Sequence, residues 1–250
     1  MLIPHQKLVI EPLDVIKPLF KKPKETIFSD YISNKKVYLT GSGRAALKTI
    51  IESNNFKKIG VPAFTCCAVE LAIKSAKASP VFIDNHIIPE IKDYPKIDAL
   101  VLPYNFGFLP NIEKIKKDCK KRNIALIEDC CQALGATYNN KLVGSFGDYS
   151  FYSFGISKNI GLLGGALGSA KQEKLNLKSY PKKEIVSALT KGLIAKYVFN
   201  PKFYSKKLIQ KELVKDQKEL NYSMPSFIKK IILIQLERYN EILYQRRKNA

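Results

Sequence analysis

The sequence has no apolar run approaching the roughly 18 residues that a membrane-spanning helix needs. Its first residues lack the basic, apolar and small-residue pattern of a secretory signal peptide. The five cysteines form no CxxC pair of the kind that binds zinc, and adjacent cysteines, which account for four of them, bridge each other poorly. We therefore expect a cytoplasmic protein whose thiols are reduced and mostly buried.

Acidic residues are scarce, with 22 Asp and Glu against 42 Lys and Arg, and the formal net charge is +20. Such a charge suits nucleic acid, an anionic membrane surface or phosphorylated substrates. Arginines are few, however, and no RNP, zinc-finger or helix-turn-helix pattern accompanies the lysines. We therefore do not expect nucleic-acid binding as the main function.

The positive charge is most concentrated between residues 171 and 218, where thirteen lysines meet four acids. Within this segment, Leu189–Leu208 is basic and apolar enough to lie on an anionic membrane, so peripheral membrane contact is one hypothesis. A helix pair packed on the core is the simpler interpretation.

Short apolar runs alternate with helical patterns between residues 36 and 170, in a chain long enough for one sizeable core. This order predicts an α/β fold of three layers, α/β/α, with a mostly parallel sheet whose ligands bind beyond the carboxyl ends of the strands. A final helix is expected over about Pro225–Arg247. The expected strands are Lys36–Leu39, Lys58–Pro62, Pro80–Asp84, Asp98–Pro103, Ile124–Asp129, Tyr149–Phe154 and Gly165–Ser169, and the expected helices between them are Arg44–Glu52, Cys67–Ala76 and Ile112–Arg122.

Two segments at the ends of expected strands suit ligand binding. Residues 41–46 (GSGRAA) combine glycines with a helix start, whose free N–H groups can bind phosphate, although the same pattern also makes an ordinary turn. Asp129 closes a buried apolar strand, where a carboxylate needs a cation or donors, or simply caps the next turn. The side chain of Glu128 should point to the opposite face, because side chains alternate along a strand.

A third segment, residues 150–159 (SFYSFGISKN), places Lys158 just after an apolar strand and before a glycine-rich return at Gly164 and Gly165. A lysine enclosed by small residues can serve imine chemistry, although a single lysine in a basic chain is usually a solvated surface residue. The three segments together favour the chemical role.

These segments resemble the DegT/DnrJ/EryC1/StrS family, the pyridoxal 5'-phosphate (PLP) dependent nucleotide-sugar aminotransferases of the aspartate aminotransferase fold, type I. The resemblance covers about residues 36–170 and 219–250, and its long central motif is specific. The similar stretches are 41–47, 61–73, 80–84, 127–160 and 220–250.

The resemblance implies roles for individual residues. Lys158 matches the Schiff-base lysine, which also moves the proton between the substrate and cofactor carbons. Asp129 matches the acid that pairs with the pyridine nitrogen, and Gln132 the residue beside the ring hydroxyl.

It also implies a phosphate site and a dimer. Ser153 matches a phosphate-binding hydroxyl, and Gly43 and Arg44 match the pair whose N–H groups hold the phosphate. Asn221 matches an asparagine that reaches the phosphate from a partner subunit, so a homodimer with shared active sites is expected.

The implied reaction is ping-pong transamination of a keto sugar carried on a nucleotide diphosphate, with an amino acid, expected to be glutamate, as donor, in amino-sugar or polysaccharide biosynthesis. A sugar dehydratase is disfavoured, because related dehydratases have histidine where this chain has Lys158. The other alternative is a truncated or non-catalytic paralogue that acts as a binding or dimerisation partner.

The chain departs from the family pattern at several positions. Cys66 stands where the family carries an aromatic ring that stacks on PLP, with Phe64 nearby, so either side chain could cover the ring. Ser223 replaces a basic residue, and Leu162 and Leu163 begin the loop that usually reads Gly-Glu-Gly-Gly.

The resemblance also divides the chain into parts. We expect an N-terminal segment over residues 1–35 and a PLP-binding large domain over 36–220, which includes the Lys-rich segment 171–218. A long helix over 221–250 then leads to a C-terminal small domain, which would begin near Gln245 and is largely missing. No metal site is expected.

Overall fold

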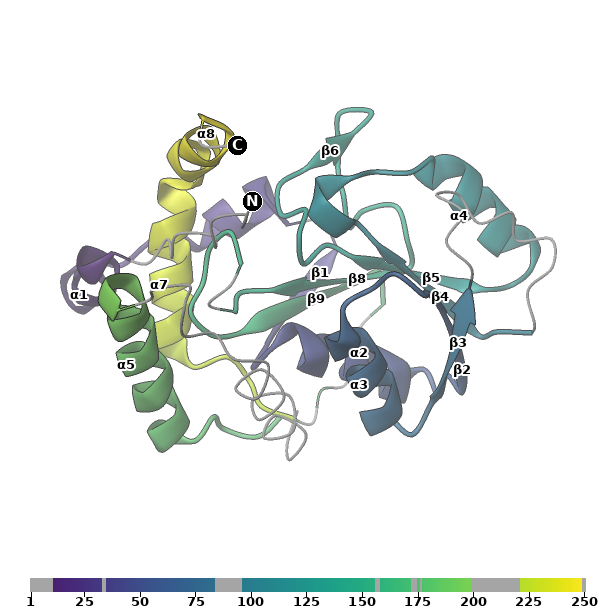
Figure 1. Ribbon diagram of the computed structural model, residues 1–250, viewed down its shortest axis with the longest axis horizontal. Helices are drawn as coiled ribbons and strands as arrows, with labels where there is room; N and C mark the ends of the chain where they lie inside the picture. The colour runs from purple at the N-terminus through teal and green to yellow at the C-terminus, as the bar shows by residue number, and fades with distance from the viewer. Residues whose placement is uncertain are drawn as a thin grey trace.

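The computed structural model describes residues 11–32, 35–83, 96–155, 158–171, 175, 177–198 and 221–248. Its centre is a seven-stranded sheet in the order β1-β9-β8-β5-β4-β2-β3, with helices on both faces (Figure 1). The strands are β1 (Lys36–Thr40), β2 (Lys58–Pro62), β3 (Ser79–Ile83), β4 (Ala99–Pro103), β5 (Ala125–Asp129), β8 (Tyr149–Ser153) and β9 (Gly165–Ser169). All seven strands expected from the sequence are present.

The sheet is mostly parallel, as predicted. Strands β3, β2, β4, β5 and β8 run parallel to one another, whereas β9 pairs antiparallel with both β8 and β1. Because β5 and β8 are adjacent and parallel, their carboxyl ends meet at one edge of the sheet.

Alternate side chains of the central strands pack into two separate hydrophobic cores, one on each face of the sheet. In β4, Ala99 and Val101 pack on one face with α2 (Gly43–Ser53) and α3 (Cys67–Ser75), while Leu100 and Leu102 pack on the other. The second face is covered by α4 (Ile112–Lys121) and α7 (Ser226–Glu237), and Figure 1 shows α4 on the opposite side of the sheet from α2 and α3. Buried strands with two apolar faces are typical of a parallel sheet between helical layers.

The C-terminal helical segment is two helices rather than the single one expected over 225–247. Helix α7 ends at Glu237, Arg238 leaves helical geometry at φ −112° and ψ 18°, and α8 (Tyr239–Lys248) starts in a new direction (Figure 1). Arg238 Nη2 lies 2.5 Å from Oδ2 of the buried Asp14 in α1 (Pro12–Phe20). This ion pair joins residues too distant in sequence for a local pattern to reveal the break.

Five further elements complete the secondary structure of the described residues. These are the 3-10 turns η1 (Glu25–Asp30) and η3 (Asn105–Gly107), the hairpin strands β6 (Thr137–Tyr138) and β7 (Lys141–Leu142), and helix α5 (Lys182–Val198). Of the proposed membrane-contacting stretch Leu189–Leu208, residues 189–198 belong to α5 and residues 199–208 lie outside the described residues. Among the residues that are described, no helix is both long and apolar enough to cross a bilayer.

Candidate active site

The start of α2 lies directly against the ends of β5 and β8. Ser42 caps the helix, and its Oγ accepts a hydrogen bond at 3.1 Å from an N–H of the first turn. A Cβ added to Gly43 would lie 3.0 Å from Cβ of Ser153 and 3.4 Å from Sγ of Cys131. Arg44 follows in the first helical turn and is half-buried. The structure therefore brings Gly43, Arg44 and Ser153 to one place, where a helix N-terminus can bind an anion.

Asp129 is a buried carboxylate at the carboxyl end of β5, with 8% of its surface exposed. In the described part of the chain, only Cys131 donates to this carboxylate, through its N–H at 3.0 Å and its thiol. Burial raises the pKa of Asp129, and the Cys131 hydrogen bonds and the charge of Lys158 oppose that shift. A carboxylate this deep with so few donors is suited to a cationic or N–H partner.

Glu128, the neighbouring residue, points to the opposite face, as the alternation along β5 predicted. Its fully buried carboxylate accepts hydrogen bonds at 2.6–2.8 Å from four donors and has the ammonium of Lys35 3.9 Å away. The donors are the hydroxyl of Tyr104 and the N–H groups of Gly144, Phe146 and Gly147. Glu128 is therefore saturated by the protein itself, whereas Asp129 is available for a ligand.

Lys158 lies in the loop that joins β8 to β9 and is partly buried. Its N–H donates to the carbonyl of Gly155 at 2.9 Å, which closes a tight turn. Its charge acts on both the Asp129 carboxyl and the Cys131 thiol, whose pKa is raised by burial and by Asp129. The charge of Lys158 is therefore within electrostatic range of the Asp129 carboxylate.

Gln132 is held in one orientation by a neighbouring loop. Its Oε1 accepts a hydrogen bond from the N–H of Phe106 at 2.9 Å, and no described residue accepts from its side-chain NH2. Phe106 has a left-handed backbone, with φ 57°, and the adjacent Asn105 donates to the carbonyl of Phe64 at 2.9 Å. The loop after β4 thus ties the loops after β2 and β5 together and leaves the Gln132 amide as a donor.

Cys66 and Phe64, the two candidates for covering a ring, both lie at the carboxyl end of β2. Cys66 is exposed at the N-cap of α3, and the Phe64 ring is 61% exposed with its centroid 6.4 Å from that of Phe106. Of the two, only Phe64 offers an aromatic face, and its carbonyl is bonded to Asn105 of the loop that holds Gln132.

Asn221 does not join the Gly43 and Ser153 cluster within its own chain. Its Oδ1 accepts a hydrogen bond at 2.7 Å from Nζ of Lys48, in the second turn of α2. The carbonyl of the following residue, Tyr222, accepts from Gly41 N at 2.6 Å, which fixes this segment beside the end of β1.

Cys131 is a site residue that the sequence reasoning missed. We had grouped it with the buried structural thiols, but it touches the Asp129 carboxylate and packs against the start of α2. Its position two residues after Asp129, where the chain turns back, was the available signal.

Comparisons with known proteins agree with this arrangement. The model of the DegT/DnrJ/EryC1/StrS aminotransferase family matches residues 22–250. The dTDP-3-amino-3,6-dideoxy-alpha-D-galactopyranose transaminase of Aneurinibacillus thermoaerophilus is 35% identical over 141 residues, which are 52% of this chain and 39% of that protein. A GDP-perosamine synthase of Escherichia coli O157:H7 is 36% identical over 108 residues, 40% of this chain and 30% of that enzyme.

Among solved structures, Helicobacter pylori PseC, an aminotransferase involved in the biosynthesis of pseudoaminic acid, has the same fold. It superposes with a TM-score of 0.66 at 20% identity, over 95% of this chain and 66% of that one. In the two sequence comparisons, with the transaminase and the GDP-perosamine synthase, the matched segments span well under half the length of each relative. Since the family model matches nearly the whole sequence, the chain belongs to the DegT/DnrJ/EryC1/StrS aminotransferase family.

Proposed function

We propose that the protein is a PLP-dependent aminotransferase that acts on a nucleotide-linked keto sugar. The observation that carries the proposal is the buried carboxylate of Asp129, to which only Cys131 donates in the described part of the chain and on which the charge of Lys158 acts. The pyridine nitrogen of PLP is the kind of N–H cation that such a carboxylate would bind. The family membership and the names of the relatives support the same reaction class.

The residues present fit the cofactor. Gly43, Arg44 and Ser153 surround a helix N-terminus that suits its phosphate, and the side-chain NH2 of Gln132 is free to donate to its ring hydroxyl. Asp129 would keep the ring nitrogen protonated. When bound, PLP supplies an electron-withdrawing ring that spreads the negative charge developed at the substrate carbon.

Lys158 would do the remaining chemistry. Its Nζ would first hold the cofactor covalently and, once displaced by substrate, would carry a proton between the substrate and cofactor carbons. The turn closed by Gly155 keeps the lysine backbone in place during both roles.

The substrates and partners follow from the relatives and from charge. Transaminases of dTDP- and GDP-linked sugars are among the similar proteins, and a net charge of +20 favours a dianionic nucleotide tail. An amino acid, expected to be glutamate, would be the donor. A homodimer in which Asn221 completes the neighbouring subunit's site is part of the proposal, and sedimentation velocity tests it.

A cytoplasmic location belongs to the same proposal, as does peripheral contact of residues 189–208 with an anionic membrane. Co-sedimentation with anionic liposomes that weakens at high salt would support the contact, and binding indifferent to lipid charge would contradict it.

A non-catalytic family member that serves as a dimerisation partner is the second candidate. The hydrogen bond that Asn221 makes to Lys48 of its own chain, together with Ser223 in place of a basic residue, favours this alternative. A sugar dehydratase is disfavoured because Lys158 is present.

The deciding experiment follows the cofactor and the nitrogen separately. Purified protein mixed with PLP should show a visible absorption band, and borohydride reduction should leave the cofactor mass on the peptide that carries Lys158. Lys158→Ala should abolish both signals, while Lys141→Ala, an exposed lysine, should change neither.

Transfer of nitrogen from 15N-glutamate to a nucleotide keto sugar would then establish transamination. A colourless protein that cannot be loaded with PLP would overturn the proposal. Cofactor binding without nitrogen transfer would favour the dimerisation partner, and a deoxy product without nitrogen would indicate a dehydratase.

A further inference from the structure

A single buried hydroxyl links the two loops that carry the candidate site. Tyr239, the first residue of α8, has none of its surface exposed. Its Oη accepts a hydrogen bond from Nδ2 of Asn159 at 3.1 Å and donates to the carbonyl of Leu134 at 3.1 Å. A phenolic hydroxyl can do both at once, because it has one proton and two lone pairs.

The two bonded residues belong to different functional loops. Asn159 follows Lys158 directly, and Leu134 lies two residues after Gln132 in the loop that begins at Asp129. We propose that Tyr239 is a positioning residue that fixes the Lys158 loop relative to the Asp129–Gln132 loop. This inference rests on the proposed function for its catalytic meaning, although the tether itself is a property of the protein without cofactor.

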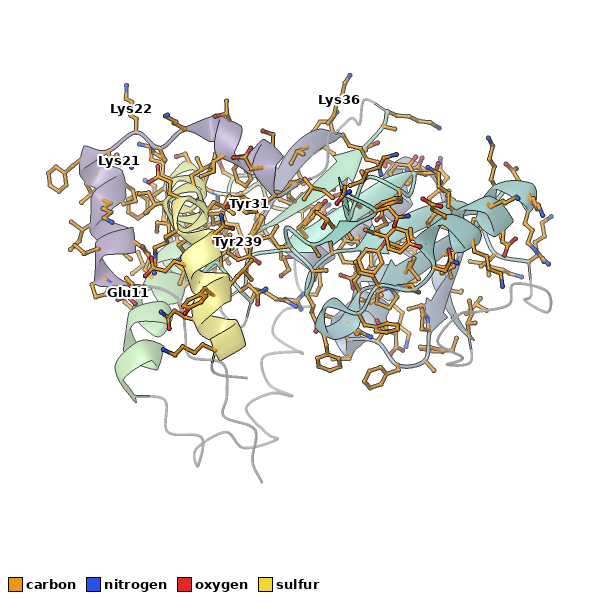
Figure 2. All side chains as sticks on the ribbon, turned by 90° about the horizontal axis from the view of Figure 1, so that it is seen from above. Glu11, Lys21, Lys22, Tyr31, Lys36 and Tyr239 are labelled. Carbon is orange, nitrogen blue, oxygen red and sulfur yellow. The ribbon has the colours of Figure 1, made fainter. Side chains whose placement is uncertain are left out.

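The tyrosine ring is held so that its hydroxyl has little freedom to move. The ring of Tyr31 packs against it edge-on, with centroids 5.1 Å apart and planes at 88° (Figure 2). Gly135, with φ 71°, passes close to both rings, and a Cβ there would lie 3.0 Å from Tyr31 and 3.4 Å from Tyr239. The ion pair between Arg238 and Asp14 anchors the adjoining backbone.

A second contact from α7 holds the far side of the same loop. Oε1 of the buried Gln235 accepts a hydrogen bond from the N–H of Gly161 at 2.7 Å. Because this bond is independent of the tyrosine, loss of the Tyr239 hydroxyl should loosen residues 158–160 without releasing the whole loop. Among the described residues, Tyr239 and Gln235 of the C-terminal helices therefore each hydrogen-bond to the lysine loop, and of these two side chains Tyr239 also bonds to the loop that begins at Asp129, at Leu134.

The test removes the hydroxyl and keeps the ring. Tyr239→Phe removes two hydrogen bonds, of which the one from Asn159 holds the lysine loop. Loss of that one buried bond should raise the amide hydrogen exchange of the peptide covering residues 158–162 by about tenfold in cofactor-free protein. Tyr244→Phe is the matched control, since Tyr244 lies on the same helix with 64% of its surface exposed and should leave exchange unchanged. Far-UV circular dichroism would verify that both variants fold.

With PLP bound, Tyr239→Phe should lower kcat about tenfold at nearly constant KM and change the midpoint of the pH titration of the visible absorption band. Asn159→Ala should reproduce these effects, and the double variant should add little, because both substitutions remove one link.

Unchanged exchange at residues 158–162 in folded Tyr239→Phe would overturn the positioning role, whether or not the protein binds PLP. Additive effects of the two substitutions would overturn it as well. Failure of the wild-type protein to bind PLP or transfer nitrogen would instead refute the proposed function, so the two failures are distinguishable.

Discussion

Replacement of Glu128 by glutamine is a severe test of the buried network beneath the site. The wild-type carboxylate accepts hydrogen bonds from four donors and lies near the ammonium of Lys35. Glutamine has the same shape but offers one acceptor oxygen, and its NH2 group would face backbone N–H donors. We therefore expect about two of the four hydrogen bonds to be lost.

The cost follows from what each bond contributes. A hydrogen bond to a charged group is worth about 1.5–3 kcal/mol, so two losses give about 3–6 kcal/mol. The smaller desolvation cost of a neutral amide offsets part of this, and we expect a net destabilisation of about 4 kcal/mol, within the range of roughly 3–5 kcal/mol for a broken buried charge network. For a chain of this length the melting temperature should fall by roughly 8–16 °C.

Urea unfolding followed by circular dichroism measures the change, provided that the slopes of the two transitions agree. Tyr104→Phe is the graded control, since it removes only one donor, at 2.7 Å, and should cost about 1–2 kcal/mol. A loss below about 1 kcal/mol for Glu128→Gln would refute the reasoning, because the carboxylate would then not organise the loop that carries its donors.

Three further predictions concern the site itself. The pKa of Asp129 is raised in the folded protein, so its carboxylate destabilises the cofactor-free fold above that folded pKa. Asp129→Asn should therefore stabilise the cofactor-free protein at pH 7, and this stabilisation should vanish below the unfolded pKa of about 3.9, which urea titrations at several pH values test. The same substitution should weaken PLP binding, which a PLP titration measures. Gly43→Ala should lower the free energy of unfolding by about 1–3 kcal/mol and weaken PLP binding, because the added methyl group would lie 3.0 Å from Ser153 at the end of β8. Gly155→Ala is the control and should be tolerated, because the nearest atom to its methyl group would be 3.7 Å away. Phe64→Ala should weaken PLP binding roughly tenfold and Cys66→Ala should not, as measured by fluorescence titration, because only the phenylalanine can stack on a ring.

Much of the fold could be predicted from local patterns. Apolar runs of strand length alternating with helical spacing gave the strands and their mostly parallel order, because burial on two faces demands continuous apolar runs. The period of two along β5 separated Glu128 from Asp129. The charge of Lys158 can act on Asp129 because Asp129 ends β5 and Lys158 follows β8, and these two strands are parallel neighbours in the sheet.

The rest depended on contacts between residues far apart in the sequence. Arg238, at the break between α7 and α8, forms an ion pair with Asp14, 224 positions away in the sequence. Phe106 lies between Asn105 and Gly107, which indicate a turn but not that the phenylalanine itself is left-handed or that its N–H bonds to Gln132 in a neighbouring loop. Such pairings have no periodicity, so only the three-dimensional structure reveals them.

The two carboxylates at the end of β5 show how one strand can separate stability from chemistry. The pleat turns Glu128 into the core, where the protein supplies its donors, and turns Asp129 toward Lys158, where in the described chain only Cys131 donates. A carboxylate that the fold itself satisfies adds stability but cannot bind a ligand, whereas one left short of donors costs stability until a ligand supplies them. The same logic assigns Tyr239 to the first kind of group. Its hydroxyl is occupied by hydrogen bonds with Asn159 and Leu134, so it can influence the chemistry only by positioning Lys158.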